Sequence, residues 1–235
     1  MRILMCIGVF FIFLNCEDKQ SRQKENNLVP DSLTTATTKE ERKEQKKPQR
    51  KYPKLTDKNA MDFFLKYEKE HKENKIRMTT DFGTIDILLY DETKFHRANF
   101  IFLTKQGYFD NTQFYRIVNN FVIQGGNSDD VSIAERRQKI GQYLLPTDTN
   151  RGFVHDRGVI SMPSSEIENP YKLASPYQFF IVQKQDGAHH LDGDYTVFGR
   201  VTDGMDVVDK IASQETDGSE WPLNNIYIRK VEIID

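Results

Sequence analysis

The side chains that could carry chemistry in this sequence do not form the common catalytic motifs. Its five histidines include no HExxH zinc motif, and neither a G-x-S-x-G nucleophile elbow nor a phosphate-binding P-loop occurs. The acidic run Asp192-Gly193-Asp194 lacks the spaced oxygen ligands and terminal glutamate of a calcium loop, so it indicates a hairpin turn. Such a chain can still catalyse a reaction that forms no lasting covalent bond. We expect neither a metal ion nor a cofactor at its site.

Both cysteines, Cys6 and Cys16, lie close to the N-terminus, and no thiol follows them. Disulfide scaffolds, zinc ribbons and catalytic cysteines are therefore excluded from residues 17–235. The sequence has 33 Lys+Arg against 35 Asp+Glu, a net charge of -2, which does not predict a broad basic surface for nucleic acid. Its 235 residues could fill one large domain or two small ones.

The first residues resemble the signal of a bacterial lipoprotein. Arg2 precedes an apolar run from Ile3 to Leu14, which as a helix spans only ~18 Å, too little for the ~30 Å core of a bilayer. Cys16 follows in a pattern that resembles a lipobox, in which the cysteine becomes the lipidated first residue. We therefore expect a lipoprotein signal peptide at 1–15, lipidation of Cys16, and a bacterial cell-envelope location at the outer membrane or the periplasmic face. The alternatives are an ordinary signal peptide and a buried apolar helix, each with an incidental cysteine.

Two further segments separate this signal from the main domain. Residues 16–56 are almost entirely polar and charged, so they cannot bury enough surface to offset the entropy of ordering, and we expect a disordered tether. Residues 57–74 predict a short amphipathic helix, with Thr56 or Asp57 as its N-cap. Its apolar positions at helical spacing are Ala60, Phe63, Phe64 and Tyr67.

Residues 75–235 predict a mainly β domain. Helical patterns occur at Lys94–Gln106, closed by Gly107, and at Met205–Ala212, and the strands do not alternate with helices as in a parallel sheet. Many short strands with two helices favour a closed eight-stranded antiparallel β-barrel capped by two α-helices. The strands are expected at Ile76–Thr79, Ile85–Leu89, Phe114–Val118, Phe121–Gln124, Gly158–Met162, Gln178–Gln183, Thr196–Val201 and Ile226–Ile234.

Four blocks of this domain, in order, resemble the signature of cyclophilin-type peptidyl-prolyl isomerases. The longest is Tyr108–Gly126, and the others are Gly158–Met162, Gln178–Ile181 and Leu191–Val201. The resemblance covers roughly residues 76–235 and implies a packed barrel with a substrate groove on its outer surface. It also implies isomerisation of X–Pro bonds in proline-containing polypeptides, without a metal or a cofactor.

Isomerisation needs no nucleophile, because only the conjugation of the amide has to be broken. That twist costs ~18–20 kcal/mol, and X–Pro bonds flip unaided in roughly tens to hundreds of seconds. The nitrogen lone pair becomes an acceptor as the bond twists, so a cationic donor aimed at it acts mainly in the transition state. Arg116, a planar and permanently charged side chain, is the expected donor. Gln124 is expected to orient its guanidinium or the substrate carbonyl.

The resemblance also implies which residues hold the substrate. The apolar slot for the proline ring is implied for Phe121, Val122, Phe180 and Leu191. Ser164 is expected to offer backbone groups to the residue before proline, and Tyr195 to flank the groove. Further substrate contacts are expected at Tyr115, Gln178 and His190.

The sequence departs from the family pattern in several places. Tyr115 stands where many members have His, and His190 where some have Trp at a site that contributes to cyclosporin binding. Residues 128–142 are charged and partly helical in pattern, where the family usually has a glycine-rich loop beside the groove. The stretch 163–177 is longer than in compact members, and Tyr177 occupies a position that is commonly small. We therefore expect a groove that is narrower or differently walled.

The same residues are compatible with a second class of function. A barrel of this kind could dock proline-containing segments without accelerating their isomerisation, as a binding module or chaperone. A nutrient-binding lipoprotein gains no support from these motifs. The sequence therefore predicts a lipid-anchored isomerase that assists the folding of envelope or secreted proteins, with the non-catalytic binding module as the alternative. We expect it to act as a monomer and to bind no nucleic acid.

Overall fold

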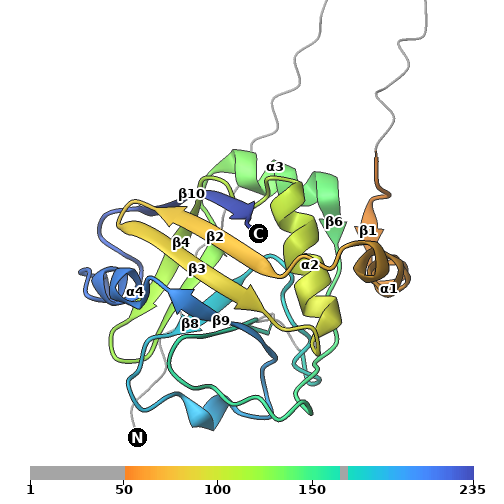
Figure 1. The fold of residues 1–235 in the computed structure, drawn as a ribbon. Coiled ribbons are helices and arrows are strands. Elements are labelled where there is room, and N and C mark those ends of the chain that lie inside the picture. Colours follow the sequence, from red (N-terminus) through yellow and green to blue (C-terminus); the bar gives the residue numbers. More distant parts are fainter. Residues whose placement is uncertain (1–50, 165–168) are drawn as a thin grey trace, which may run out of the picture. The chain divides into compact units, whose positions relative to one another are not determined.

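The computed structural model describes residues 51–164 and 169–235 of the chain. The expected signal peptide at 1–15, the lipid anchor on Cys16 and most of the expected tether lie outside these residues. The described residues contain a closed antiparallel β-barrel, drawn in Figure 1. Its strands are β2 (Lys75–Thr80), β3 (Gly83–Leu89), β4 (Thr112–Val118), β5 (Val122–Asn127), β7 (Val159–Ser161), β8 (Phe179–Val182), β9 (Val197–Asp203) and β10 (Ile226–Ile233).

Neighbouring strands follow one another around the barrel in the order β10-β2-β3-β9-β7-β8-β5-β4. Each coincides with an expected strand, so the predicted eight-stranded antiparallel barrel is confirmed. Spatial order differs from sequence order, because β9 lies between β3 and β7, and β10 closes the barrel between β2 and β4. Closure pairs the backbone groups that an edge strand would expose.

The two predicted capping helices lie on opposite sides of the barrel in Figure 1. α2 (Lys94–Lys105) contacts β9 and β10, and α4 (Met205–Ala212) contacts β3, β4 and β5. Gly107 follows the C-cap of α2 with a φ of 62°, a left-handed conformation that glycine adopts without strain. The predicted end of this helix is therefore confirmed.

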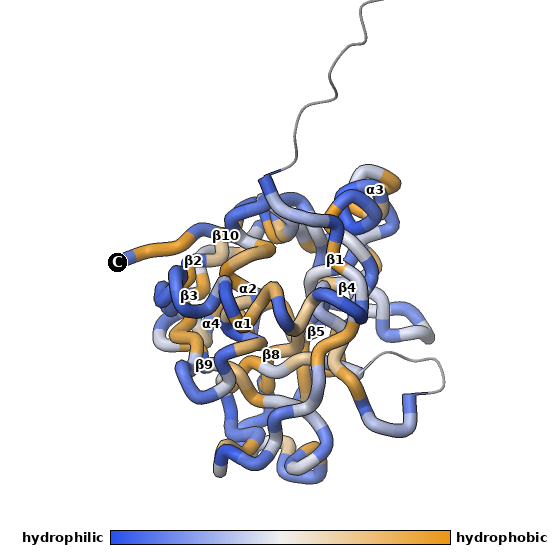
Figure 2. The backbone as a smooth tube through the Cα atoms, turned by 90° about the vertical axis from the view of Figure 1, so that its right-hand side faces the viewer, coloured by the Kyte–Doolittle hydropathy of each residue, from blue (hydrophilic) through white to orange (hydrophobic). Residues whose placement is uncertain are grey.

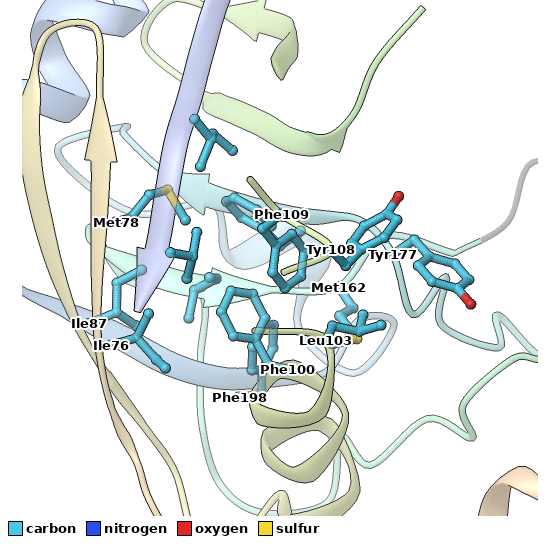
Figure 3. Packing of buried hydrophobic residues seen from close by; sticks show 14 of the residues in the cluster. Ile76, Met78, Ile87, Phe100, Leu103, Tyr108, Phe109, Met162, Tyr177 and Phe198 are labelled. Atoms are coloured by element: carbon cyan, nitrogen blue, oxygen red, sulfur yellow. The ribbon is translucent and has the colours of Figure 1, made fainter. Parts of the chain in front are cut away.

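Apolar side chains fill the barrel interior. Along β2, Ile76 and Met78 are buried while Arg77 between them is exposed, the alternation of a strand with one wet face. Phe100 of α2 enters the interior and stacks on Phe109 with ring centroids 4.5 Å apart (Figure 3). Figure 2 colours the described chain by hydropathy and shows many of its hydrophobic segments near the centre. A packed interior leaves the outer surface as the place for a substrate groove.

A third helix, α1 (Ala60–Glu70), precedes the barrel and packs on α2. Phe63 of α1 meets Phe102 of α2 edge to face, with ring centroids 5.1 Å apart. Tyr67 meets the same ring at 5.4 Å. The amphipathic helix expected within residues 57–74 is therefore present, and its aromatic face is the one that packs.

The segment before α1 differs from the sequence expectation in two ways. The helix follows Asn59, so the prediction of Thr56 or Asp57 as its N-cap is wrong. The Asn59 side chain accepts a hydrogen bond from the Thr56 backbone N–H at 2.8 Å, which folds the preceding turn. β1 (Leu55–Thr56) pairs in parallel with β6 (Gly141–Gln142), so the last residues of the expected disordered tether belong to the folded domain.

The charged segment after β5 forms a helix of its own, α3 (Val131–Ile140). The Asp130 side chain caps it by accepting a hydrogen bond from the Ser132 N–H at 2.7 Å. Arg136 donates to the Gly107 carbonyl at 2.6 Å, which ties α3 to the end of α2. This helix is an addition to the two predicted caps. No helix in the described part of the chain is long and apolar enough to cross a membrane.

His96 of α2 is a base buried in the core. Its side chain lies beside Phe198, is 0% exposed, and has no hydrogen-bond partner on either ring nitrogen among the described residues. Burial disfavours the charged ring and lowers the pKa of His96 from 6.5 to about 4. The unfolded chain therefore takes up this proton near pH 6.5, whereas the folded chain resists it until about pH 4. The resulting stability is fully present above this window and is lost as the pH falls through it.

We expect the free energy of unfolding to fall by about 3 kcal/mol between about pH 7 and pH 4 on account of His96. Urea unfolding at a series of pH values measures this change. The His96→Leu variant has an apolar side chain of similar size and no base. Its free energy of unfolding should therefore fall by about 3 kcal/mol less over the same pH range. Superimposable pH profiles for the two proteins would contradict the prediction.

Candidate active site

A hollow of about 280 Å³ opens on the outer surface over β4, β5 and β8. Most of the predicted site residues line it, and Pro163 is an addition to them. The lining residues are Arg116, Phe121, Val122, Gln124, Pro163, Ser164, Phe180, Leu191 and Tyr195. The structure thus brings the predicted donor, its predicted partner and the predicted slot into one place.

The pairing of β4, β5 and β8 sets three of these side chains in one row. Arg116 is the cross-strand partner of Gln124, which in turn is the partner of Phe180. Directly paired residues point to the same face of a sheet. The next pair, Ile117 and Ile123, is buried in the barrel core, so the row faces outward. A shift of one residue in the pairing of these strands would turn the affected side chain toward the barrel interior.

β4 is irregular beside this row. Its register shifts between Phe114 and Arg116, which leaves Tyr115 as an extra residue opposite β5, as in a β-bulge. The Tyr115 ring lies 5.9 Å from the ring of Trp221, and Tyr115 is not among the residues that line the hollow. Its role as a substrate contact therefore stays a prediction.

Two other predicted contacts, His190 and Gln178, are not among the residues that line the hollow. The exposed His190 ring stacks on Phe121 with centroids 5.3 Å apart, and so supports one side of the slot. Gln178 directly precedes β8 and is partly buried. Tyr177, at the position that is commonly small, donates its hydroxyl hydrogen to the Gly141 carbonyl at 2.7 Å. Its ring is buried, so Tyr177 does not narrow the hollow.

The predicted slot belongs to a small apolar cluster separate from the barrel core. Val122 and Phe180 are its members in the hollow, with only 2% and 5% of their surface exposed. Phe121, Leu191 and Tyr195 pack around them and are partly buried. The hollow therefore presents a rigid apolar surface on which a pyrrolidine ring could be buried.

A series of hydrogen-bonded polar side chains supports the slot. The His155 ring stacks on Phe180 with centroids 5.8 Å apart, and its Nδ1 and Nε2 lie 2.7 Å from Asp192 Oδ1 and 3.2 Å from Ser161 Oγ. This order resembles a hydrolytic triad, but Ser161 is 0% exposed and its hydroxyl donates to the Thr196 carbonyl. Burial lowers the pKa of His155, while the hydrogen bond to Asp192 opposes that shift. These three side chains therefore support Phe180, and the buried Ser161 is not an accessible nucleophile.

One residue beside the site was not predicted from the sequence. Arg116 Nε donates a hydrogen bond to Glu220 Oε2 at 2.6 Å, and the two residues are 104 positions apart. Glu220 lies in the loop between α4 and β10, and no local pattern links it to β4. Gln124, expected to orient the guanidinium or the substrate carbonyl, is the cross-strand partner of Arg116, and the ion pair of Arg116 is with Glu220.

The longer loop, residues 163–177, makes contacts within itself and with the segment that precedes β9. Ser164 forms an isolated antiparallel bridge with Ala174. Lys172 forms an ion pair with Asp194, and its Nζ lies 5.6 Å from the centre of the Tyr195 ring. In residues 51–164 and 169–235, no group of three or more His, Cys, Asp and Glu side chains could hold a metal ion.

Comparison with known proteins defines the class of this barrel. A family model described as "Cyclophilin type peptidyl-prolyl cis-trans isomerase/CLD" matches residues 75–233. The chain belongs to this family, as its four sequence blocks and its barrel indicate.

Individual relatives agree with this assignment. A "Peptidyl-prolyl cis-trans isomerase-like 2" of Rhizopus delemar is 34% identical over 71% of this chain, which spans only 30% of that protein's length. A "Peptidyl-prolyl cis-trans isomerase" of Acinetobacter baylyi is 33% identical over 60% of this chain and 73% of its own. A crystal structure of a Cryptosporidium parvum cyclophilin-type isomerase in the presence of the dipeptide Ala-Pro is similar, with a TM-score of 0.57 and 26% identity. It covers 68% of this chain and 99% of that protein's chain.

Proposed function

We propose that this chain is a peptidyl-prolyl cis-trans isomerase. The observation that carries the proposal is the outward row of Arg116, Gln124 and Phe180 at an apolar slot. Membership of the cyclophilin-type family supports it. The Ala-Pro dipeptide named for the Cryptosporidium protein supports proline-containing polypeptides as the substrates.

The hollow suits the physical needs of this reaction. Val122 and Phe180 hold the pyrrolidine ring, and Arg116 stands at the same hollow, where a guanidinium can donate to the amide nitrogen as the bond twists. A pre-placed charged donor is worth about 3 kcal/mol. Acceleration by a factor of about 10⁴ needs roughly 5.5 kcal/mol. Exclusion of water and fixation of the chain on both sides of the bond supply the remainder.

A protease-free isomerisation assay on a short X–Pro peptide tests the proposal. The cis–trans relaxation rate should rise in proportion to the protein concentration, far above the uncatalysed rate. Peptide binding without acceleration would favour the alternative, a non-catalytic binding module or chaperone. If the protein neither binds the peptide nor accelerates its isomerisation, the proposal is wrong.

We further propose that Cys16 anchors the isomerase in a bacterial envelope, where it assists the folding of envelope or secreted proteins. The signal-like pattern at 1–15 and the polar segment 16–56 support this proposal, since together they have the composition of an anchor and a stalk. A tether of this kind would let a monomeric isomerase domain reach clients near the membrane.

Replacing the anchor residue should release the protein. In the Cys16→Ser variant we expect no incorporation of labelled fatty acid and a shift from the membrane to the soluble fraction, because each buried CH₂ of an acyl chain contributes about 0.8 kcal/mol to membrane binding. Cys6→Ser is the matched control and should be labelled like the wild-type protein. Labelling of Cys16→Ser, or absence of label from the wild-type protein, would contradict lipidation at this residue.

A further inference from the structure

The ion pair of Arg116 engages one particular nitrogen of its guanidinium. Nε donates to Glu220 Oε2 at 2.6 Å, and Arg116 lines the hollow whereas Glu220 is not part of its wall. Guanidinium is planar and carries five N–H donors in a fixed fork. A bond at Nε therefore fixes the plane of the whole group and leaves the two Nη groups as the donors for a ligand. We infer that Glu220 is a positioning residue that aims Arg116 at the proline slot; this inference rests on the proposed isomerase function.

The backbone attaches Glu220 to the strand that carries Arg116. The Ile117 N–H of β4 donates to the Glu220 carbonyl at 2.9 Å, so the carboxylate is held in register with the adjacent Arg116. Glu220 has a φ of 63°, in the left-handed region that non-glycine residues adopt infrequently. Such a conformation persists where the surrounding structure holds it. The placement of this carboxylate is therefore set by the fold rather than by chance rotation of a surface side chain.

A compact turn holds the loop around Glu220. Asp217 Oδ1 accepts hydrogen bonds from the backbone N–H groups of Ser219 at 2.8 Å and Trp221 at 3.0 Å. The Asp217 N–H donates to the Trp221 carbonyl at 2.8 Å, and the Glu220 N–H donates to the Asp217 carbonyl at 3.1 Å. Trp221 then packs near Tyr115 of β4. The turn and its contact with β4 give Glu220 a rigid base.

The exposure of this ion pair indicates that it orients Arg116 rather than stabilises the fold. The Arg116 and Glu220 side chains are 36% and 43% exposed, and exposed ion pairs contribute little to folding. A donor aligned with the amide nitrogen acts on the twisted bond and only weakly on the planar ground state. Loss of the carboxylate should therefore lower kcat more than it raises KM.

The Glu220→Ala variant tests this inference in the isomerisation assay. We expect kcat about tenfold lower, with KM changed less than about twofold and with an unchanged melting temperature. Glu220→Gln keeps an uncharged acceptor of the same length, so it should recover part of the lost kcat. Glu215→Ala removes an exposed carboxylate from the same loop and is the control, expected to match the wild-type protein.

A double-mutant comparison separates action through Arg116 from any other cause. In an Arg116→Ala background, adding Glu220→Ala should change kcat less than about twofold, because no guanidinium remains to be aimed. An active wild-type protein with an unchanged kcat in Glu220→Ala, or the same tenfold loss in both backgrounds, would overturn the inference alone. An inactive wild-type protein would overturn the proposed function and this inference together.

Discussion

The Arg116→Ala variant is expected to lose about 10²-fold in kcat/KM on an X–Pro peptide, the loss typical for removal of one pre-placed donor. Arg116 lies in the outward row, and among the described residues that line the hollow it is the one charged side chain, so none of the others can replace it. The isomerisation assay with matched protein concentrations measures this loss. Circular dichroism should show an unchanged fold, because the side chain is 36% exposed and outside the barrel core.

Two variants sharpen the Arg116 result. Arg116→Lys keeps a positive charge but loses the planar fork, so we expect activity between those of the wild-type protein and Arg116→Ala. Arg200→Ala removes an exposed arginine of β9 that does not line the hollow, and should match the wild-type protein. Wild-type activity in Arg116→Ala would remove the guanidinium from the mechanism.

The Gly126→Ala variant should lose about 3 kcal/mol of stability, a large effect for a single added methyl group. Gly126 lies in the site strand β5 with a φ of 93°, and an added Cβ would lie 2.4 Å from the Tyr177 carbonyl oxygen. That atom belongs to the backbone just before Gln178 and β8, so a rotamer change cannot relieve the clash. For a domain of this size the loss corresponds to a fall of about 10 °C in Tm.

Gly152→Ala separates the clash from the backbone strain at Gly126. Gly152 has a similarly positive φ of 79°, but no atom lies within 4 Å of an added Cβ. We expect Gly152→Ala to cost about 1 kcal/mol, the price of the left-handed conformation alone. Thermal unfolding of the two variants side by side measures the difference. Equal Tm values would show that β8 moves freely away from β5.

The barrel could be predicted from the sequence because its signals are local. The alternation of Ile76 and Met78 with exposed neighbours marks a strand with one wet face, and Gly107 marks the end of α2. Most of the hollow could be predicted as well, through the ordered resemblance of four blocks. The structure adds that cross-strand pairing places Arg116, Gln124 and Phe180 in one row.

The remaining features depend on contacts that no local pattern encodes. Glu220 reaches Arg116 from 104 positions away through a turn of its own. Tyr115 is displaced by a bulge, which depends on how β4 pairs with β5 rather than on its own residue type. Asn59 rather than Thr56 or Asp57 is the N-cap because its carbonyl accepts a helical hydrogen bond from the Phe63 N–H, while its side chain bonds to the Thr56 N–H of the preceding turn. The ordering of Leu55 depends on its pairing with Gly141, on the far side of α3 in the sequence.

The central claim is that Arg116 acts on the twisted amide and not on the planar one. Exchange NMR of a short X–Pro peptide in complex with the protein gives both its Kd and the cis–trans rate within the complex. We predict that Arg116→Ala slows the rate in the complex about 10²-fold while Kd rises less than about threefold. An unchanged rate in the complex, or a loss of affinity as large as the loss of rate, would contradict the claim.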